Sequence, residues 1–217
     1  MKKFELTNEF VTNMFGTKLF RIRALVEFGD VEAGELGGYV EKESNLGHDD
    51  NAWVYDNAWV YGDAQVSGDA QVSGNARVYD NAWVYGDAQV SGNARVYGNA
   101  LVCGNALVYG NAWVYGNAQV SGDARVCGDA RVCGNGDYAY AHGFGSVNRT
   151  TTFFRLKDGG VGVRCGCFYG TLAQFRDKIR ETHGETKKAQ EYLMLADLME
   201  LRFEEDENEV GNRKYVE

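Results

Sequence analysis

The hydrophobic and polar residues between positions 51 and 134 follow a period of six, repeated fourteen times without an insertion. The first slot of each hexapeptide is Asn or Asp, the second is always Ala, the fourth is always Val, and the sixth is Gly or Asp. Because side chains two apart on an extended strand point to the same side, the Ala and Val slots face inward and the third and fifth slots face outward. Gly followed by Asn or Asp tolerates the backbone angles of a tight turn. The pattern therefore predicts a β-solenoid that turns a corner every six residues.

The repeated motif also resembles that of a known family. The stretch from Val54 to Trp59, VYDNAW, has Asp56 where most copies have Gly, and it is similar to the hexapeptide repeat of left-handed parallel β-helices. The resemblance covers the whole repeat, from Asn51 to Gly134. It implies a triangular prism with three hexapeptides per coil, nearly five coils in all, wound in the left-handed sense. At a strand spacing of about 4.8 Å, the prism would be roughly 22 Å long.

The segments on either side of the repeat are expected to cap it, because a solenoid must cover its apolar ends and free strand edges. Upstream, the stretch 36–40, LGGYV, has the inward and outward spacing of an imperfect coil. Downstream, Tyr138 and Phe144 fall on the Val slot, whereas Gly136 and His142 fall on the Ala slot. The repeat is therefore expected to decay gradually after its last copy.

A β-hairpin and two helices are predicted after the solenoid. The sequence TTFFRLKDGGVGVRCGCF has the pattern of a hairpin that turns at DGG, residues 158–160. Thr171 and Gln174 form a capping box for one helix, and apolar residues recur at helical spacing from about 187 to 203. The predicted fold is mainly β, a left-handed parallel β-helix with a C-terminal β-hairpin and two-helix module. Its expected parts are an N-terminal cap with an imperfect coil at 1–50, the β-helix at 51–145, and a C-terminal capping or interaction module at 146–217.

With three hexapeptides per coil, residues separated by three repeats lie on the same face of the prism. One face gathers tyrosines, two tryptophans and three of the four arginines of the repeat region. Its outward residues are Trp59, Tyr61, Arg77, Tyr79, Arg95, Tyr97, Trp113, Tyr115, Arg131 and Cys133. Three interpretations are open: stacking that only stabilises the ladder, self-association as a trimer or dimer, and recognition of a partner, for which Tyr, Trp and Arg are enriched.

The flanking segments have a resemblance of their own. FRIRALVEFGDVEAGELGGYVEKESNLGHDDNAWVY before the repeat and RCGCFYGTLAQFRDKIRETHG after it are similar to repeat proteins of bacteriophages and prophages. Together with the repeat, this resemblance spans nearly the whole chain. It implies a phage context, and it implies no particular chemistry.

Charge and cysteine content narrow the possible partners and the compartment. The net charge is −9, and no part of the chain is a basic arm, so sequence-independent binding to nucleic acid is not expected. The N-terminal sequence MKKFELTNEF lacks the apolar run of a signal peptide, and no stretch is long enough to span a membrane. Five cysteines without a secretion signal indicate reduced thiols. We therefore expect a cytoplasmic protein, in the host cell if a phage encodes it.

The segment SVNRTTT suggests a second candidate site, in the C-terminal module. It concentrates hydroxyl, amide and guanidinium groups, which can all bind phosphate oxygens. The proposed anion cradle consists of Asn148, Arg149, Thr150, Thr151, Thr152 and Arg164. The alternative interpretation is a polar loop between the solenoid and its cap.

Evidence for catalysis or a metal is weak in this sequence. Many left-handed β-helix proteins are acyltransferases, in which a histidine projects from the coils to deprotonate the acceptor. Here the coils contain no histidine, and His48, His142 and His183 all lie in the flanks. Cys165 and Cys167 could meet one ligand, with His183 as a weak third candidate, but zinc needs four ligands. We therefore expect neither a resident metal nor another cofactor.

The leading hypothesis is a non-enzymatic, phage-encoded binding protein that acts on a host component. Its partner would be a host protein or a small nucleotide ligand. It would thus inhibit a defence protein or sequester the nucleotide signal of that protein, through the C-terminal module or the Tyr/Trp/Arg face. One alternative is an acyltransferase-like enzyme that uses His142 or His183 across a subunit boundary. Another is a structural spacer or virion component.

Overall fold

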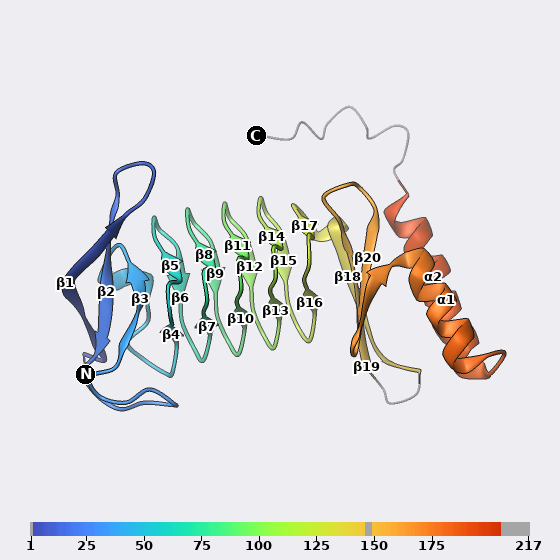
Figure 1. Cartoon of the computed structure of the whole chain (residues 1–217), viewed down its shortest axis with the longest axis horizontal. Coiled ribbons are helices and arrows are strands. Elements are labelled where there is room, and N and C mark those ends of the chain that lie inside the picture. Colours follow the sequence, from blue (N-terminus) through green and yellow to red (C-terminus); the bar gives the residue numbers. More distant parts are fainter. Residues whose placement is uncertain (1, 146–148, 205–217) are drawn as a thin grey trace.

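The protein is a rod with a β-solenoid in the middle, an N-terminal cap at one end and a helix-covered sheet at the other (Figure 1). The computed structural model describes residues 2–145 and 149–204. Asn148 of the expected anion cradle therefore lies outside the described residues. Within the described residues, no helix is long and apolar enough to cross a membrane.

Each hexapeptide contributes one two-residue strand, formed by its third and fourth slots. The strands are β4 Trp53–Val54, β5 Trp59–Val60, β6 Gln65–Val66, β7 Gln71–Val72, β8 Arg77–Val78, β9 Trp83–Val84, β10 Gln89–Val90, β11 Arg95–Val96, β12 Leu101–Val102, β13 Leu107–Val108, β14 Trp113–Val114, β15 Gln119–Val120, β16 Arg125–Val126 and β17 Arg131–Val132. Every third strand pairs in parallel, and the register joins each residue to its equivalent one coil further on, as in Arg77↔Arg95 and Val78↔Val96. Three parallel sheets result, which confirms the predicted prism. Its left-handed winding remains a prediction from the family resemblance.

The interior of the prism is a continuous column of small apolar side chains. Every Ala of the second slot and every Val of the fourth slot is fully buried. An Ala and a Val two positions apart share the inner side of a strand, so each coil fills its own triangular cross-section. Burial of this column is the main stabilising contribution of the solenoid.

The corners combine left-handed backbone angles with side-chain ladders. The Gly of the sixth slot has a positive φ, for example +69° at Gly92, and Asp56 and Asp80 adopt the same region at 54° and 60°. Each of these aspartates accepts a hydrogen bond from the Gly N–H one coil further on. Asn side chains form amide ladders along the corners, and one runs Asn75→Asn93→Asn111→Asp129.

The N-terminal cap extends one wall of the prism with an antiparallel hairpin. Strands β1 Phe4–Thr12, β2 Lys18–Ala24 and β3 Leu36–Val40 lie in the order β1-β2-β3-β5. Strand β3 pairs in parallel with β5, which confirms the imperfect coil predicted at 36–40. A short 3₁₀ helix, η1 Glu43–Asn45, follows it. The hairpin itself was not predicted.

Aromatic rings of the cap close the first coil. Trp53 is fully buried, and the rings of Phe4 and Phe28 meet it edge-on at 6.2 and 5.3 Å. The buried Lys3 amine donates to the carbonyls of Asp50 and Ala52 and lies over the Phe28 ring. Burial lowers the pKa of Lys3 to about 8.

The C-terminal module is a four-stranded antiparallel sheet between the last coil and two helices. Its strands are β18 Tyr138–Phe144, β19 Arg149–Arg155, β20 Val161–Cys165 and β21 Phe168–Thr171, and a 3₁₀ turn, η2 Asn135–Asp137, precedes them. Tyr138 and Phe154 join the core of the solenoid, while Phe153 and Val163 join a second core under the helices. The hairpin turn at 158–160 is confirmed.

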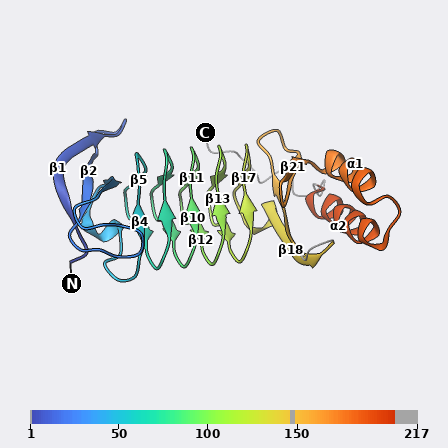
Figure 2. The same ribbon diagram turned by 60° about the horizontal axis from the view of Figure 1, so that its bottom comes forward.

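Both predicted helices are present and lie side by side (Figure 2). Helix α1 Leu172–His183 begins with the expected capping box, in which Thr171 accepts from the Gln174 N–H. Helix α2 Lys187–Phe203 has the predicted bounds and buries one side against the sheet and α1.

The gradual decay of the repeat after residue 134 was a wrong prediction. The chain leaves the prism at η2, and β18 turns to pair antiparallel with β19. Only Tyr138 stays inward, whereas His142 and Phe144 are exposed. Residues 135–145, which we expected to continue the β-helix, therefore belong to the C-terminal sheet and the turn before it.

Candidate functional site

The face predicted to collect aromatic and cationic residues exists as one continuous wall. Strands β5, β8, β11, β14 and β17 are neighbours in one sheet, and their outward side chains run Trp59, Arg77, Arg95, Trp113, Arg131. We call this row, together with the adjacent Tyr61, Tyr79, Tyr97 and Tyr115, the arginine–aromatic wall. Its members are half-buried by one another.

The guanidinium groups of the wall lie on its indole rings. The Arg77 guanidinium is 4.5 Å from the centre of the Trp59 ring. Trp113 is enclosed by two arginines, with Arg95 at 4.8 Å and Arg131 at 4.3 Å. Such cation–π contacts hold a flexible side chain over a flat ring and fix the position of its charge.

The four tyrosines form a stack beside the arginine row. The ring centres of Tyr61, Tyr79, Tyr97 and Tyr115 follow one another at 5.0, 4.9 and 5.2 Å, and the planes are nearly parallel. Burial raises the pKa of Tyr61, Tyr79 and Tyr97 above the usual value for a phenol. Stacking that stabilises the ladder therefore accounts for the arrangement of the tyrosine rings. It does not account for the row of arginines beside them.

The stack predicts how the fold responds to alkali. A folded-state pKa above the unfolded value of 10.0 means that the neutral phenol stabilises the fold below pH 10, and that this stabilisation is lost as pH rises further. We expect the thermal midpoint to fall steeply above pH 10 and to fall less in Tyr79→Phe. Tyr140→Phe, whose ring is exposed outside the stack, is the control. Tyrosinate absorbance and circular dichroism measure both effects, and equal profiles for the two variants would contradict the prediction.

The centre of the wall carries two arginines on adjacent strands. Arg77 and Arg95 face each other across adjacent strands, at a separation of about 4.8 Å between strands. Among the residues that the structure describes, the ion pairs join other groups, and no carboxylate lies within 4.0 Å of either guanidinium. The two guanidinium groups lean in opposite directions, Arg77 over Trp59 and Arg95 over Trp113, and each keeps N–H donors that could bind an anion.

Two more groups extend the wall toward the N-terminus. Tyr39 pairs with Trp59 in register, and its hydroxyl accepts from Arg21 at 3.0 Å and donates to Glu9 at 3.0 Å. Arg21 is therefore neutralised locally, unlike Arg77 and Arg95. This extension does not follow from the repeat, because the step from Tyr39 to Trp59 is longer than the step of one regular coil.

The other two faces of the described prism lack such a row of charges. One is covered at its start by the cap over Trp53 and at its end by the C-terminal sheet, where Thr152 Oγ1 accepts from the Arg125 N–H. The other carries the exposed pair Trp83 and Tyr85. Its remaining outward positions in the coils are Gln65, Ser67, Leu101, Cys103, Gln119 and Ser121.

Among the described residues, the structure brings only part of the expected anion cradle together. Thr151 and Thr152 are buried on opposite sides of β19, where Thr151 donates to Cys165 Sγ and Thr152 accepts from Arg125. Thr150 is within 2.9 Å of His142. Arg149 lies across Gly166, while Arg164 pairs with Thr152 in register. Alternation along β19 places Thr151 on the opposite side from Thr150 and Thr152.

The weak metal candidates do not form a site among the described residues. Cys165 ends β20 and is half-buried, whereas Cys167 is exposed in the turn before β21, so the two do not share one strand face as expected. The His183 ring stacks on Tyr192 at 5.9 Å. No group of three or more potential ligands gathers in the described part of the chain. His48 stacks on Phe4 at 4.5 Å and accepts from the Lys3 N–H.

Parallel ladders, three hexapeptides per coil and an Ala/Val interior define the protein as a capped hexapeptide-repeat β-solenoid. The family model of the YdcK beta solenoid repeat matches residues 70–86, 88–103, 100–116 and 118–134. Most of the repeat region thus matches a β-solenoid repeat family, in agreement with the observed coils. A comparison with curated proteins found no match.

Proposed function

We propose that the protein is a non-enzymatic binding protein whose arginine–aromatic wall captures an anionic partner. The observation that carries this proposal is the adjacent pair Arg77 and Arg95, which is held on indole rings and lacks a carboxylate partner among the described residues. The partner is an acidic surface of a host protein or a small nucleotide ligand. A phage origin, suggested by the flanking sequences, makes a defence protein or its nucleotide signal the intended target.

Three properties of the wall support binding over a purely structural role. The side chains are fixed before a ligand arrives, so little entropy is lost on binding. Guanidinium groups can grip carboxylate or phosphate oxygens with two hydrogen bonds each. The wall is also a local cationic surface on a protein of net charge −9, and this contrast selects for a compact anionic group and against an extended polyanion.

The absence of catalysis is part of the same proposal. Each histidine has a contact that explains its position: His48 with Phe4, His142 with Thr150, and His183 with Tyr192. The coils contain no histidine that could deprotonate an acceptor beside the wall. An acyltransferase reaction is therefore not proposed.

The test compares two double variants with the same loss of charge. Arg77→Gln/Arg95→Gln removes the central pair, and Arg125→Gln/Arg180→Gln removes two exposed arginines elsewhere. Bound host proteins and nucleotides are identified by mass spectrometry after affinity capture, and their affinity is measured by calorimetry. We expect the wall variant to bind roughly 10- to 100-fold more weakly for each arginine removed. The control should stay within about twofold. Equal losses in both variants, or no loss in either, would overturn the proposal.

A further inference from the structure

Helix α2 carries a second apolar side that faces away from the protein. Its buried side consists of Ala189, Tyr192, Ala196, Met199 and Phe203. Met194, Leu198 and Leu201 lie on the opposite side and are 71%, 54% and 67% exposed. Their spacing of four and three positions aligns them along one stripe of the helix. We call these three residues the outer stripe.

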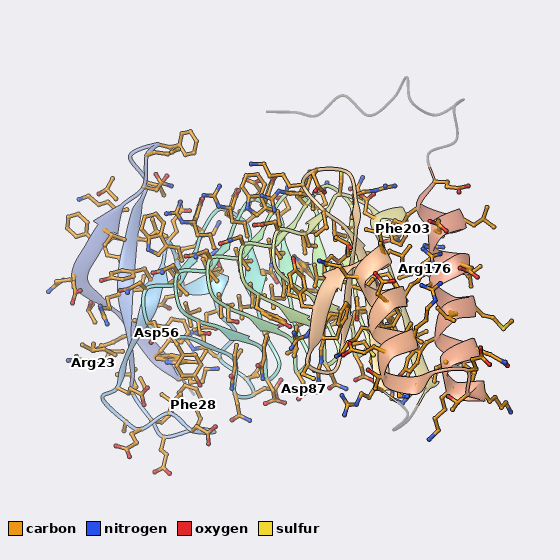
Figure 3. All side chains as sticks on the ribbon, turned by 45° about the vertical axis from the view of Figure 1, so that its right-hand side comes forward. Arg23, Phe28, Asp56, Asp87, Arg176 and Phe203 are labelled. Atoms are coloured by element: carbon orange, nitrogen blue, oxygen red, sulfur yellow. The ribbon has the colours of Figure 1, made fainter. Side chains whose placement is uncertain are left out.

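The outer stripe lies at the end of the rod, where nothing in the described chain covers it. Helices α1 and α2 form the last layer beyond the C-terminal sheet (Figures 1 and 3). Figure 3 shows side chains extending from the outer side of this layer, with Arg176 and Phe203 marking the two helices. A contiguous apolar strip rimmed by charged residues is typical of a protein–protein contact.

We propose that the outer stripe binds a second copy of the same chain, with the two α2 helices parallel around a two-fold axis. A two-fold axis makes each stripe its own partner, so Leu198 and Leu201 meet their equivalents in the second copy. The spacing of the stripe is that of the a and d positions of a coiled coil, in which side chains pack into holes on the facing helix.

The charges beside the stripe favour this parallel arrangement. Asp197 and Arg202 lie on opposite flanks, at g and e positions, and parallel helices bring Asp197 of each copy to Arg202 of the other. Antiparallel helices would instead bring Asp197 to its own equivalent and Lys188 to Arg202. The parallel arrangement gives two attractive pairs, because the Asp197–Arg202 contact occurs twice. The antiparallel arrangement gives three repulsive pairs, one between the two copies of Asp197 and two between Lys188 and Arg202.

Both charged groups have capacity for the additional contact. Asp197 accepts from Arg176 at 2.8 Å, and its side chain remains 70% exposed. Arg202 donates one N–H to the Asn135 carbonyl at 3.2 Å, which leaves further donors on a guanidinium that has five. Arg176 is itself held by Glu200, so it stays in place if Asp197 shifts toward the second copy.

The exposed apolar area of the outer stripe sets the expected affinity of the dimer. Three side chains with these exposures present roughly 350 Å² of apolar surface per copy, compared with about 800 Å² per partner in a stable complex of standard size. The dimer is therefore weak and depends on concentration. It would join two rods end to end and place two arginine–aromatic walls in one particle, which favours partners with repeated sites. The inference does not rest on what the wall binds.

Sedimentation equilibrium and light scattering test the dimer over about 5 to 500 µM. We expect the mass of the wild-type protein to rise from 24.0 kDa toward twice that value. Met194→Ser/Leu198→Ser should remain monomeric across the range. The control is Met14→Ser/Phe15→Ser, because these two side chains are almost fully exposed at the opposite end of the rod. This control should dimerise like the wild type.

A charge exchange tests the orientation. Arg202→Asp should weaken the dimer by about tenfold, and Asp197→Arg/Arg202→Asp should restore most of the affinity. A wild-type protein that stays monomeric, or a dimer that survives Met194→Ser/Leu198→Ser, would overturn the inference. A dimer strengthened by Arg202→Asp would overturn the parallel arrangement. A trimer that is lost in Arg77→Gln/Arg95→Gln would place self-association on the wall instead.

Discussion

Replacing Trp113 by alanine is expected to lower the free energy of unfolding by about 3 kcal/mol. The indole is half-buried between Arg95 at 4.8 Å and Arg131 at 4.3 Å, and it meets the Tyr97 ring edge-on at 6.2 Å. Its removal therefore exposes apolar surface and ends two cation–π contacts at once. Chemical denaturation followed by circular dichroism measures the change.

Trp83→Ala is the matched control for this prediction. Trp83 occupies the same slot of the hexapeptide on another face, but it is 48% exposed and no cation lies over its ring in the described structure. We expect this variant to lose no more than about 1 kcal/mol. If both variants lose the same amount, the stacked arginines contribute nothing to the stability of the wall.

Gly92→Val is expected to destabilise the protein by about 3 kcal/mol or more, because two costs add at one corner. The residue has a φ of +69°, which a β-branched side chain rarely adopts. A Cβ atom would also lie 3.1 Å from the backbone N of Gly110 in the next coil. That neighbour is backbone inside a hydrogen-bonded stack and cannot move aside.

Gly92→Asp should cost much less, about 1 kcal/mol at most. Asp56 occupies the same corner two coils earlier with a φ of 54°, and its carboxylate accepts from the Gly74 N–H. The same bond is open to an aspartate at position 92, with the Gly110 N–H as donor. Thermal and urea unfolding of the two variants distinguish the outcomes, and equal losses would show that space alone decides what this corner accepts.

The solenoid could be predicted in detail because its rule is local. Each hexapeptide specifies an inward Ala, an inward Val and a corner, so the register between coils and the composition of the wall follow from counting. The two helices were also predictable, since the Thr171 capping box and the apolar spacing after Lys187 are short-range signals.

The remaining structure depends on contacts that counting does not reveal. The β1–β2 hairpin has no repeat, and its neighbour β3 joins the wall through Tyr39 and Trp59, a step that does not match the regular coil. The stretch after residue 134 retains the slots of the repeat, but a longer antiparallel pairing with β19 directs it away from the prism. The threonines of the expected anion cradle do not form one surface, because consecutive residues in a strand point to opposite sides.

The three-sided winding constrains how the gene for this protein can lengthen or shorten. A duplication or deletion of three hexapeptides would add or remove one whole coil and leave every column of side chains on its own face of the prism. A change of one or two hexapeptides would preserve the motif and the packed interior, but it would move all later columns of side chains onto another face of the prism. If that change lay between Arg95 and Trp113, Trp113 and Arg131 would no longer continue the row of Arg77 and Arg95, so selection for that row would tolerate only whole coils there.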